Sequence, residues 1–404
     1  MGNFKKILCV LLVAALFGGC TAAPSVITTI ATTGAPTTAA TTTAATTTGA
    51  ITGTTTGAPT THAPTTVAPT TVAPTTVAPT TVAPTTTTTP TTSVQKDRYL
   101  LSFAGDCTLG ENYDEEGARG TYTYVVGKNY SYPMANVKHI FEADDLTFVN
   151  LECALTASEP TEEEMVELST HRFRFRGPTD YTNILTSSSI EVASCANNHS
   201  RDYGQAGLLD TWKALDDAGV AYASFGKSRV VTTEGGLKVG VCAIFFYLTQ
   251  SQIENVVTYL RGQGAEIIVM SIHWGDEGIY EPADFQQDMA HMAIDAGVDI
   301  VYGHHSHTLM PIEAYNGGII YYSLGNFSFG GNCNPTDKDT AIIQQEVLRN
   351  PDGTVTLGNT TAIPCRVSTV DNWNDYRPTP YDPEHEGYQR ALSKLSGTFL
   401  ESNP

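Results

Sequence analysis

The chain has 404 residues and a formal net charge of −20, but its charges are distributed very unevenly. All 42 acidic residues and 20 of the 22 basic residues lie in residues 96–404, which gives that part a net charge of −22. So acidic a surface excludes nucleic acid as a partner, since nucleic-acid binding requires a basic face, and it argues against electrostatic docking to anionic lipid. An anionic substrate would therefore need a metal ion or a few local cations.

The amino terminus has the pattern of an export signal. Lys5 and Lys6 precede the apolar segment 7–17, which is too short to cross a bilayer as a helix of about 20 residues. Two glycines then lead to Cys20, a pattern similar to a bacterial lipobox, where cleavage leaves a lipidated cysteine. We therefore expect residues 1–20 to be a lipoprotein-type signal, with the mature protein held at the cell membrane through Cys20. Ordinary cleavage a few residues later, which gives a secreted protein, is the alternative.

Residues 21–96 form a segment of low complexity in which Thr, Ala and Pro dominate. The pentad Val-Ala-Pro-Thr-Thr occurs four times in succession between Val67 and Thr86. Because so few large apolar side chains are present, the composition predicts a disordered or polyproline-like linker. Such a linker reaches roughly 230 Å if fully extended and roughly 50 Å as a flexible coil, which is enough to hold a domain clear of a membrane.

Residues 97–404 make one domain-sized block, in which short apolar runs alternate with amphipathic segments. The predicted strands, in chain order, are 99–104, 146–151, 190–194, 239–246, 267–272, 300–302 and 319–323. Helix-like segments, such as 204–218 and 283–296, lie between them. Strands that alternate with helices of this length predict an α/β fold, in which a sheet is flanked by helices.

Polar side chains follow five of the predicted strands. They are Asp106, Glu152, residues 197–199, His273 and residues 304–307, and they include five of the ten histidines. Ligands of α/β proteins collect beyond the carboxyl ends of the strands, so these groups are expected to converge at one edge. Imidazoles combined with carboxylates and an amide oxygen suit Mn, Fe or Zn. For any single residue the alternative is a hydrogen-bonded loop or capping role.

Six short motifs occur in order within residues 98–380. They are FAGDCTLG (103–110), NLECALT (150–156), ANNHSRDYG (196–204), HWGDEGIYEP (273–282), GHHSH (303–307) and SLGNFSFGG (323–331). Together they closely resemble the CapA-type capsule-synthesis proteins, a family associated with poly-γ-glutamate production and related to the calcineurin-like metallophosphoesterases. The resemblance implies a four-layer α/β/β/α sandwich with a dinuclear metal site at the edge of the sheets.

The resemblance also implies roles for individual residues. It makes Glu152 a ligand that bridges two metal ions and His199 the general acid for the leaving group. Asp202 is the candidate carboxylate that orients His199, and an ordinary turn aspartate is the alternative. The implied metal ligands are Asp106, Glu152, Asn198, His273, His305 and His307.

Two motifs depart from the pattern of active phosphoesterases. Thr108 stands where the Asp-x-His motif has its histidine, which removes one imidazole from one metal position. The second motif reads Asn-Leu-Glu in place of Gly-Asp. The expected cofactor is therefore one or two divalent ions, with Mn, Fe or Zn as the candidates.

Three further residues are candidates for substrate binding, namely Arg176, Asn197 and Glu277. Arg176, within the segment 173–177, is the candidate anion contact, with a solvated arginine on a strand edge as the alternative. Trp274 either lines the pocket or belongs to the core. Asn326, on the turn after the last strong strand, is expected to have a structural role or a place at the edge of the site.

Six cysteines follow Cys20, and an even number allows 15 pairings. Cys107 and Cys153 each follow a candidate ligand directly, so a disulfide between them is reasonable if their strands are neighbours. Cys195 and Cys242 lie in apolar runs and are expected to be buried thiols.

These features predict an envelope-anchored, metal-binding protein of the CapA type. It would act on an anionic surface polymer, plausibly poly-γ-glutamate, or help to assemble and export it, together with membrane proteins of a capsule synthase. If it is catalytic, the reaction is metal-assisted hydrolysis or transfer at a phosphoester or amide. The alternatives are a non-catalytic accessory protein that binds polymer carboxylates or partner proteins, and a general secreted phosphodiesterase.

Overall fold

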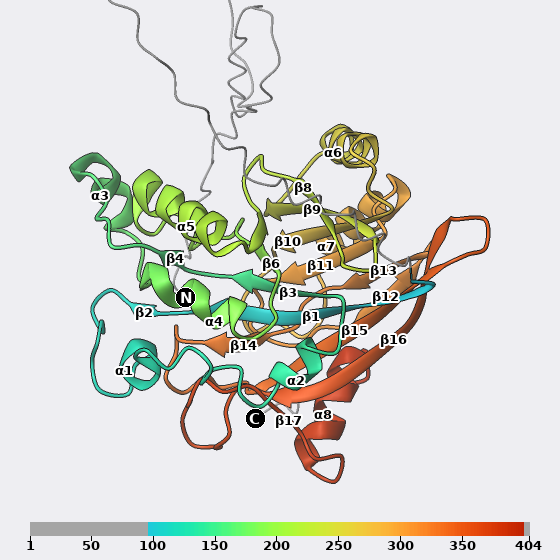
Figure 1. Ribbon diagram of the computed structural model, residues 1–404. Helices are drawn as coiled ribbons and strands as arrows, with labels where there is room; N and C mark the ends of the chain where they lie inside the picture. The colour runs from blue at the N-terminus through green and yellow to red at the C-terminus, as the bar shows by residue number, and fades with distance from the viewer. Residues whose placement is uncertain (1–95, 400–404) are drawn as a thin grey trace, which may run out of the picture. The chain divides into compact units, whose positions relative to one another are not determined.

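The computed structural model describes residues 96–399, which form an α/β domain (Figure 1). The predicted signal with Cys20, and the predicted linker apart from Lys96, lie outside the described residues. All seven predicted strands and both named helices are present, so the predicted α/β class is confirmed. Within residues 96–399, no helix has the length and apolar character needed to cross a membrane.

The larger sheet has eight strands in the order β17-β16-β15-β1-β3-β6-β7, and β14 also pairs with β1. Strands β1, β3, β6 and β7 run parallel to one another, and β14 is parallel to β1. Strand β15 is antiparallel to β1, β16 is antiparallel to β15, and β17 is antiparallel to β16. The bounds are β1 (Arg98–Thr108), β3 (Leu146–Leu151), β6 (Val192–Ser194), β7 (Ala221–Ala223), β14 (Asn326–Phe329), β15 (Asp339–Arg349), β16 (Val355–Arg366) and β17 (Thr379–Pro380).

The second sheet has six strands in the order β12-β13-β11-β10-β9-β8, of which β9, β10, β11 and β13 are parallel. Its strands are β8 (Arg229–Thr232), β9 (Lys238–Phe245), β10 (Ile267–His273), β11 (Ile300–His304), β12 (Ile312–Tyr315) and β13 (Gly318–Tyr321). A small third sheet is made of β2 (Glu111–Asn112), β5 (Phe175–Gly177) and β4 (Ala154–Leu155).

The two large sheets face each other across a buried apolar core. Phe103 of β1 stacks on Phe148 of β3, with ring centroids 4.8 Å apart. From the second sheet, Tyr302 and Tyr321 approach Phe103 to 5.1 and 5.4 Å. Inward-facing residues of both sheets therefore interdigitate in one layer.

Helices cover the outer faces of the two sheets (Figure 1). The larger sheet is covered by α1 (Tyr122–Val126), α2 (Lys138–Phe141), α4 (Thr182–Thr186) and α5 (Gly204–Ala218), and the second sheet by α6 (Gln250–Gly262) and α7 (Asp284–Asp295). The remaining helices are α3 (Glu162–Leu168), the short 3-10 helix η1 (Thr179–Tyr181) and α8 (Glu386–Leu395). Two residues of α8, Ala391 and Leu395, join the core between the sheets.

Helix α5 shows how local sequence sets these elements. Its buried residues Leu208, Thr211 and Leu215 recur at spacings of three and four, so one face packs inward. The helix ends at Gly219, whose φ of 73° is the left-handed conformation that glycine adopts without strain. The start of α5 follows directly on the segment 197–203, which belongs to the candidate site.

Strands β1 and β14 approach each other unusually closely beside the candidate site. A Cβ atom on Gly105 would lie 2.0 Å from the carbonyl oxygen of Gly325, so no other residue fits there without moving the backbone. The backbone N–H of Asp106 donates to the same carbonyl at 2.8 Å. This contact places Asn326 in register beside Asp106.

A half-buried acid two residues before β3, Asp144, leads to a prediction about pH and stability. Burial raises the pKa of Asp144 from 3.8 to about 7, against the hydrogen bonds from Ser102 and Thr147 that lower it. Because the folded protein holds this proton more tightly than the unfolded chain does, the domain is most stable with respect to this group below about pH 4. It loses that stability as the pH rises to about 7.

We expect Asp144→Asn to raise the free energy of unfolding at pH 8 by roughly 2–4 kcal/mol and to change it little at pH 4. Urea denaturation at the two pH values measures this difference. The matched control is Asp288→Asn, which changes an exposed carboxylate on α7 and should leave stability unchanged at both. An equal effect of Asp144→Asn at pH 4 and pH 8 would contradict the assignment.

Candidate metal centre

The carboxyl ends of parallel strands from both large sheets meet at one place. Asp106 lies near the end of β1, and Glu152 directly follows β3. His273 is the last residue of β10, and β11 ends at His304 just before His305. The predicted convergence of these polar groups is confirmed, although they come from two facing sheets and not from one.

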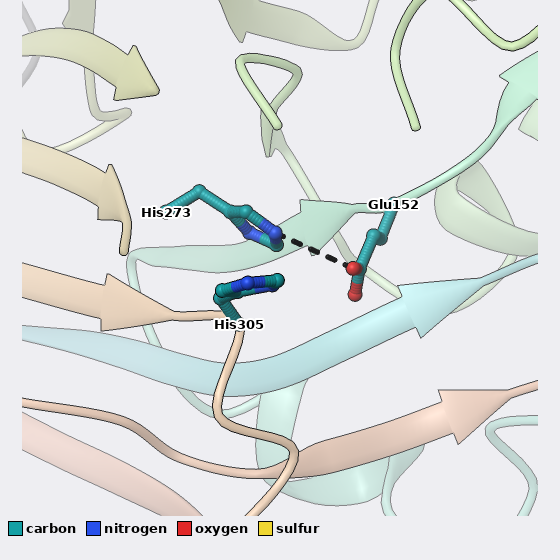
Figure 2. A group of neighbouring side chains, drawn as sticks. All are labelled: Glu152, His273 and His305. Atoms are coloured by element: carbon teal, nitrogen blue, oxygen red, sulfur yellow. Dashed lines mark ion pairs between the residues drawn. The ribbon is translucent and has the colours of Figure 1, made fainter. Parts of the chain in front are cut away.

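Side chains at this edge form three groups that could hold a metal ion, each with ligand atoms within 4.8 Å of one another. The groups are Glu152 with His273 and His305, Asp106 with Glu152 and His307, and Glu277 with His305 and His307. Figure 2 shows the first group, with the Glu152 carboxylate facing both imidazoles and its Oε1 atom 3.4 Å from Nε2 of His273. Glu152 belongs to two of the groups, so its carboxylate could contribute to either.

Several polar atoms of the centre are buried without a hydrogen-bond partner. They are both carboxylate oxygens of Glu152, Nε2 of His273, Nδ1 of His305 and Oδ1 of Asn198. Buried polar atoms in folded proteins nearly always have a partner, so a cluster of unpartnered ones indicates a missing ligand. Lone pairs of imidazole nitrogens and carboxylate and amide oxygens suit a divalent ion such as Mn, Fe or Zn. The residues present therefore fit a divalent metal.

Asp106 is held rigidly in its ionised form. Its Oδ1 accepts a hydrogen bond from Nδ2 of Asn150 at 2.9 Å and lies 3.2 Å from Nδ1 of His304. Burial alone raises the pKa of Asp106, but the hydrogen bonds from His304 and His307 outweigh it and hold the pKa well below its usual value. A negative charge is thus fixed at the centre of the site.

The pKa of the second carboxylate, Glu152, is shifted in the opposite direction. Burial raises the pKa of Glu152 well above its usual value, and the charge of Asp106 raises it further. Two buried acids at one place are unfavourable unless a cation lies between them. A bound cation would relieve this repulsion.

The pKa values of the histidines at this site are also shifted, in different directions. Burial, together with the neighbouring histidines, lowers the pKa of His273 well below its usual value and that of His305 to about 4. Both are therefore neutral imidazoles, the form that ligates metals. Burial also lowers the pKa of His307, but Glu152 and Asp106 outweigh it and raise the pKa to about 9.

The segment 303–307 carries backbone strain at two of its histidines. His305 has a φ of 93° and His307 a φ of 58°, in a region that costs a residue with a side chain about 1–3 kcal/mol. Such strain persists only where the surrounding structure enforces it, and it concentrates at functional sites. It is found here at the two histidines that share the third candidate metal group.

His199 is oriented from one side by Asp202, as predicted. Nδ1 of His199 lies 2.7 Å from Oδ2 of Asp202, which also accepts the backbone N–H of Phe175 at 2.6 Å. The ring of Phe175 packs against the imidazole, with centroids 4.3 Å apart. His199 is close enough to the metal centre to interact electrostatically with His305.

Asn197 was predicted to contact substrate, but its side chain is bonded within the protein. Its Nδ2 donates to Oδ1 of Asn150 at 3.1 Å and to the carbonyl of Leu151 at 2.9 Å. Its Oδ1 accepts the backbone N–H of His199 at 3.2 Å and the hydroxyl of Ser200 at 2.9 Å. Both ends of this amide are used inside the protein, so the structure gives Asn197 a positioning role that links the His199 segment to Asp106 through Asn150.

Arg176 is also engaged within the protein. Its guanidinium pairs with Glu116 at 2.8 Å and with Glu159 at 2.6 Å, and it lies over the ring of Tyr203. An anionic substrate would have to displace two carboxylates to reach it. Glu277, by contrast, is exposed and sits within reach of His305 and His307, so it fits a metal ligand as well as the predicted substrate contact.

The contacts of three other residues, Trp274, Thr108 and Asn326, show where each of them lies. Trp274 is fully buried and donates from Nε1 to the carbonyl of Tyr322, so it belongs to the core. The hydroxyl of Thr108 donates to the backbone carbonyl of Glu152 at 3.1 Å. Thr108 therefore supports the backbone of Glu152, in the position where the phosphoesterase motif has a histidine. Asn326 is buried beside Asp106, and its Oδ1 has no partner.

The predicted disulfide between Cys107 and Cys153 is wrong, because both are free, buried thiols. The strands are neighbours, but Cys107 of β1 pairs with Leu151 of β3, which puts Cys153 two residues past the opposite position and beyond the reach of a disulfide. Cys195 and Cys242 are buried thiols, as predicted.

Two residues of the candidate centre were not assigned roles from the sequence, namely Asn150 and His304. Both support Asp106 from the side, and His304 is fixed in turn by the hydroxyl of Ser271 at 3.0 Å. The available signal was the alternation along β3, which puts Asn150 on the same side as Glu152. A polar residue in an otherwise apolar strand calls for a partner.

The fold and the site together define an α/β protein with a candidate divalent-metal centre between two facing sheets. A family model described as "Bacterial capsule synthesis protein PGA_cap" matches residues 100–331, more than half of the chain. The chain belongs to this family of bacterial capsule synthesis proteins, as the six motifs predicted.

Named relatives agree with this assignment. The chain is 28% identical over 285 residues to the "PGA biosynthesis protein CapA" of Bacillus subtilis (strain 168), covering 64% of this chain and 70% of that protein. It is 26% identical over 282 residues to the "Capsule biosynthesis protein CapA" of Bacillus anthracis, covering 63% and 66% respectively. The match thus spans about two thirds of the length of each relative.

Solved structures show weaker likeness. A putative 5'-nucleotidase from Staphylococcus aureus aligns with a TM-score of 0.40 and 12% identity over 68% of this chain and 56% of that one. The purple acid phosphatase PPD1 from yellow lupin gives a TM-score of 0.34 and 12% identity over 76% and 58%.

Proposed function

We propose that this protein is an envelope-anchored, metal-dependent protein of hydrolase type that acts in the biosynthesis or export of an anionic capsule polymer, poly-γ-glutamate. The observation that carries the proposal is the set of buried, unpartnered ligand atoms on Glu152, His273, His305 and Asn198. The names of the two Bacillus relatives support the capsule and polymer part. Anchoring through lipidated Cys20, contact with capsule synthase membrane proteins and the four-layer metallophosphoesterase-like architecture are parts of the same proposal.

The chemistry follows from what each residue can do. A divalent ion would be held by Asp106, Glu152, Asn198, His273, His305 and His307. It would supply Lewis acidity and lower the pKa of a coordinated water. His199 would give a proton to the leaving group, and Asp202 would hold the imidazole in the required orientation through Nδ1. Phe175 packs on His199 and would help to hold the imidazole in place.

A metal also resolves the conflict between an acidic domain and an acidic polymer. Residues 96–404 carry a net charge of −22, which repels carboxylates over the surface at large. Salt screens such remote charges beyond about 8–10 Å, whereas a divalent ion acts at contact distance. The polymer would therefore be attracted only at the centre and at local groups of cations.

A non-catalytic accessory role is the second candidate, and Thr108 is the observation that favours it. This residue takes the place of an imidazole, and its hydroxyl is used as a brace on the backbone of Glu152. With one ligand fewer, the centre could hold one ion tightly and bind polymer carboxylates without turnover.

Metal analysis and assays on the purified protein separate the candidates. We expect bound Mn, Fe or Zn by mass spectrometry, and shortening of poly-γ-glutamate by gel filtration, with phosphodiester cleavage measured in parallel to detect a general phosphodiesterase. Absence of any bound transition metal would rule out the proposed centre. Bound metal without turnover, together with unchanged polymer output in cells that carry His199→Ala, would favour the accessory role.

A further inference from the structure

A cavity of about 430 Å³ lies apart from the metal centre, between α8, the segment before β15 and the end of β16. Its size falls in the range of small-ligand sites. None of its lining residues belongs to the three candidate metal groups. Lys338, Arg366, Arg390 and Lys394 line it, so four of the 20 basic residues of this acidic part of the chain gather at one cavity. We call it the α8 cavity.

Two of these cations are neutralised by buried carboxylates. Lys394 is 3% exposed and pairs with Asp337 at 2.7 Å and Asp339 at 2.8 Å. Arg390 donates two hydrogen bonds to the fully buried Asp339, from Nε at 2.7 Å and from Nη2 at 2.8 Å. These two cations and two carboxylates form a rigid, balanced base for the cavity.

The other two cations lack a buried acid. Lys338 bonds only neutral oxygens, namely Oδ1 of Asn334 at 2.9 Å and the carbonyl of Pro335 at 3.1 Å. Arg366 pairs with Asp371 at 3.0 Å, but the Asp371 side chain is 87% exposed, and a surface pair of this kind contributes little. The remaining acid of the lining, Glu386, is 88% exposed and lies 3.9 Å from Arg390. Within the described residues, Lys338 thus has no acidic partner and Arg366 has only an exposed one, so these two cations are the ones that a ligand can reach most easily.

Aromatic rings make up much of the remaining wall. Tyr280 packs on Phe399 with centroids 5.0 Å apart, and the ammonium of Lys394 lies over both rings. Tyr381 stacks on His385 at 4.9 Å. Such walls suit methylene groups, so the cavity as a whole fits acid groups that are separated by short apolar spacers.

We propose that the α8 cavity binds two neighbouring carboxylates of an acidic oligomer, one at Arg366 and the other at Lys338, with the intervening methylenes against Tyr280 and Tyr381. The identity of the oligomer as a γ-linked glutamate chain rests on the proposed function. The cavity would hold one part of the polymer while another part reaches the metal centre.

The loop after β10 connects the two places. Glu277 of a candidate metal group and Tyr280 of the α8 cavity are three residues apart, which limits their Cα separation to about 11 Å. The loop is fixed to the histidine segment, because Gly278 N–H donates to the carbonyl of Ser306 and the Thr308 hydroxyl donates to the carbonyl of Ile279. A polymer of a few units can therefore span both places.

Isothermal titration with a γ-linked glutamate hexamer tests the proposal on the whole protein. We expect the double variant Lys338→Gln/Arg366→Gln to weaken binding at least tenfold, and binding to weaken with added salt. The matched control is Arg172→Gln, which changes an exposed arginine that lies over Phe173 and should leave affinity unchanged. An unaltered affinity in the double variant would overturn the proposal.

Two further arms define the ligand and the site. Free glutamate should bind at least tenfold more weakly than the hexamer, and equal affinity would overturn the assignment to a polymer. The titration is repeated after metal removal with 1,10-phenanthroline, a neutral chelator that does not compete as an anion. Binding that persists and still depends on Lys338 and Arg366 supports the α8 cavity even if the proposed metal chemistry fails, and binding that vanishes with the metal would overturn it.

Discussion

Replacing Glu152 by glutamine is expected to lower the affinity of the protein for Zn²⁺ or Mn²⁺ by at least about 100-fold, which exceeds the 10–100-fold typical of residues one shell farther out. Glu152 is shared by two of the three candidate metal groups, and both of its oxygens are buried without a partner. Glutamine keeps the volume but removes the charge and one oxygen lone-pair set. Metal content by mass spectrometry and competition with a chromophoric chelator measure the loss.

The same substitution should have opposite effects on stability with and without metal. In metal-free protein, burial and the charge of Asp106 disfavour the ionised form of Glu152, so removing its charge should raise the melting temperature relative to metal-free wild type. In metal-loaded protein, the variant should melt below wild type, because it gains less from bound metal. Calorimetry with and without metal distinguishes the two cases.

Glu159→Gln is the control for this experiment, since Glu159 is an exposed acid that pairs with Arg176 and belongs to none of the metal groups. It should retain full metal content and the metal-dependent rise in melting temperature. If Glu152→Gln also kept its metal at wild-type affinity, the centre between the two sheets would not be the metal site.

The strands, and the side chains that end them at the candidate site, could be predicted from the sequence because each is marked by a local pattern. An apolar run such as 146–151 marks a buried strand, and a charged residue such as Glu152 directly after it marks the strand's end. These signals need no knowledge of the partners of a strand. The position of β3 and the meeting of Asp106, Glu152 and His273 were therefore predicted correctly.

Features that depend on long-range pairing could not be predicted from the residues in the same way. Asp106 and His273 come from different sheets, and only the pairing order of β1, β3, β10 and β11 shows it. The hairpin of β15 and β16 was missed because much of β16 is polar and exposed, so it lacks the apolar run that marks a strand.

The hydrogen-bond and ion-pair partners of side chains could not be predicted from the sequence either. Arg176 and Asn197 were predicted to bind substrate because polar residues stood near the motifs, but Glu116, Glu159 and Asn150 occupy them. The failed Cys107–Cys153 disulfide likewise depended on register, because Cys153 lies two residues past the position opposite Cys107.

His199→Ala is expected to lower turnover by about 10²–10⁴-fold while leaving bound metal in place. His199 is held by Asp202 and Phe175 near the centre but belongs to none of the three metal groups found among the described residues. Its proposed task is to protonate the leaving group, which metal ligands do not share. Turnover and metal content, measured on the same preparation, separate the two functions.

The dependence on leaving group tests that task directly. A p-nitrophenolate leaving group needs little protonation, so His199→Ala should slow its release far less than the release of an alkoxide or an amine. Asp202→Asn should show the same pattern to a smaller extent, because it disturbs only the orientation of the imidazole. His291→Ala, which removes a histidine paired with Glu313 away from the centre, is the matched control and should change neither rate. An equal loss for all leaving groups would instead make His199 a positioning residue, since a proton donor must matter most where the departing group is most basic.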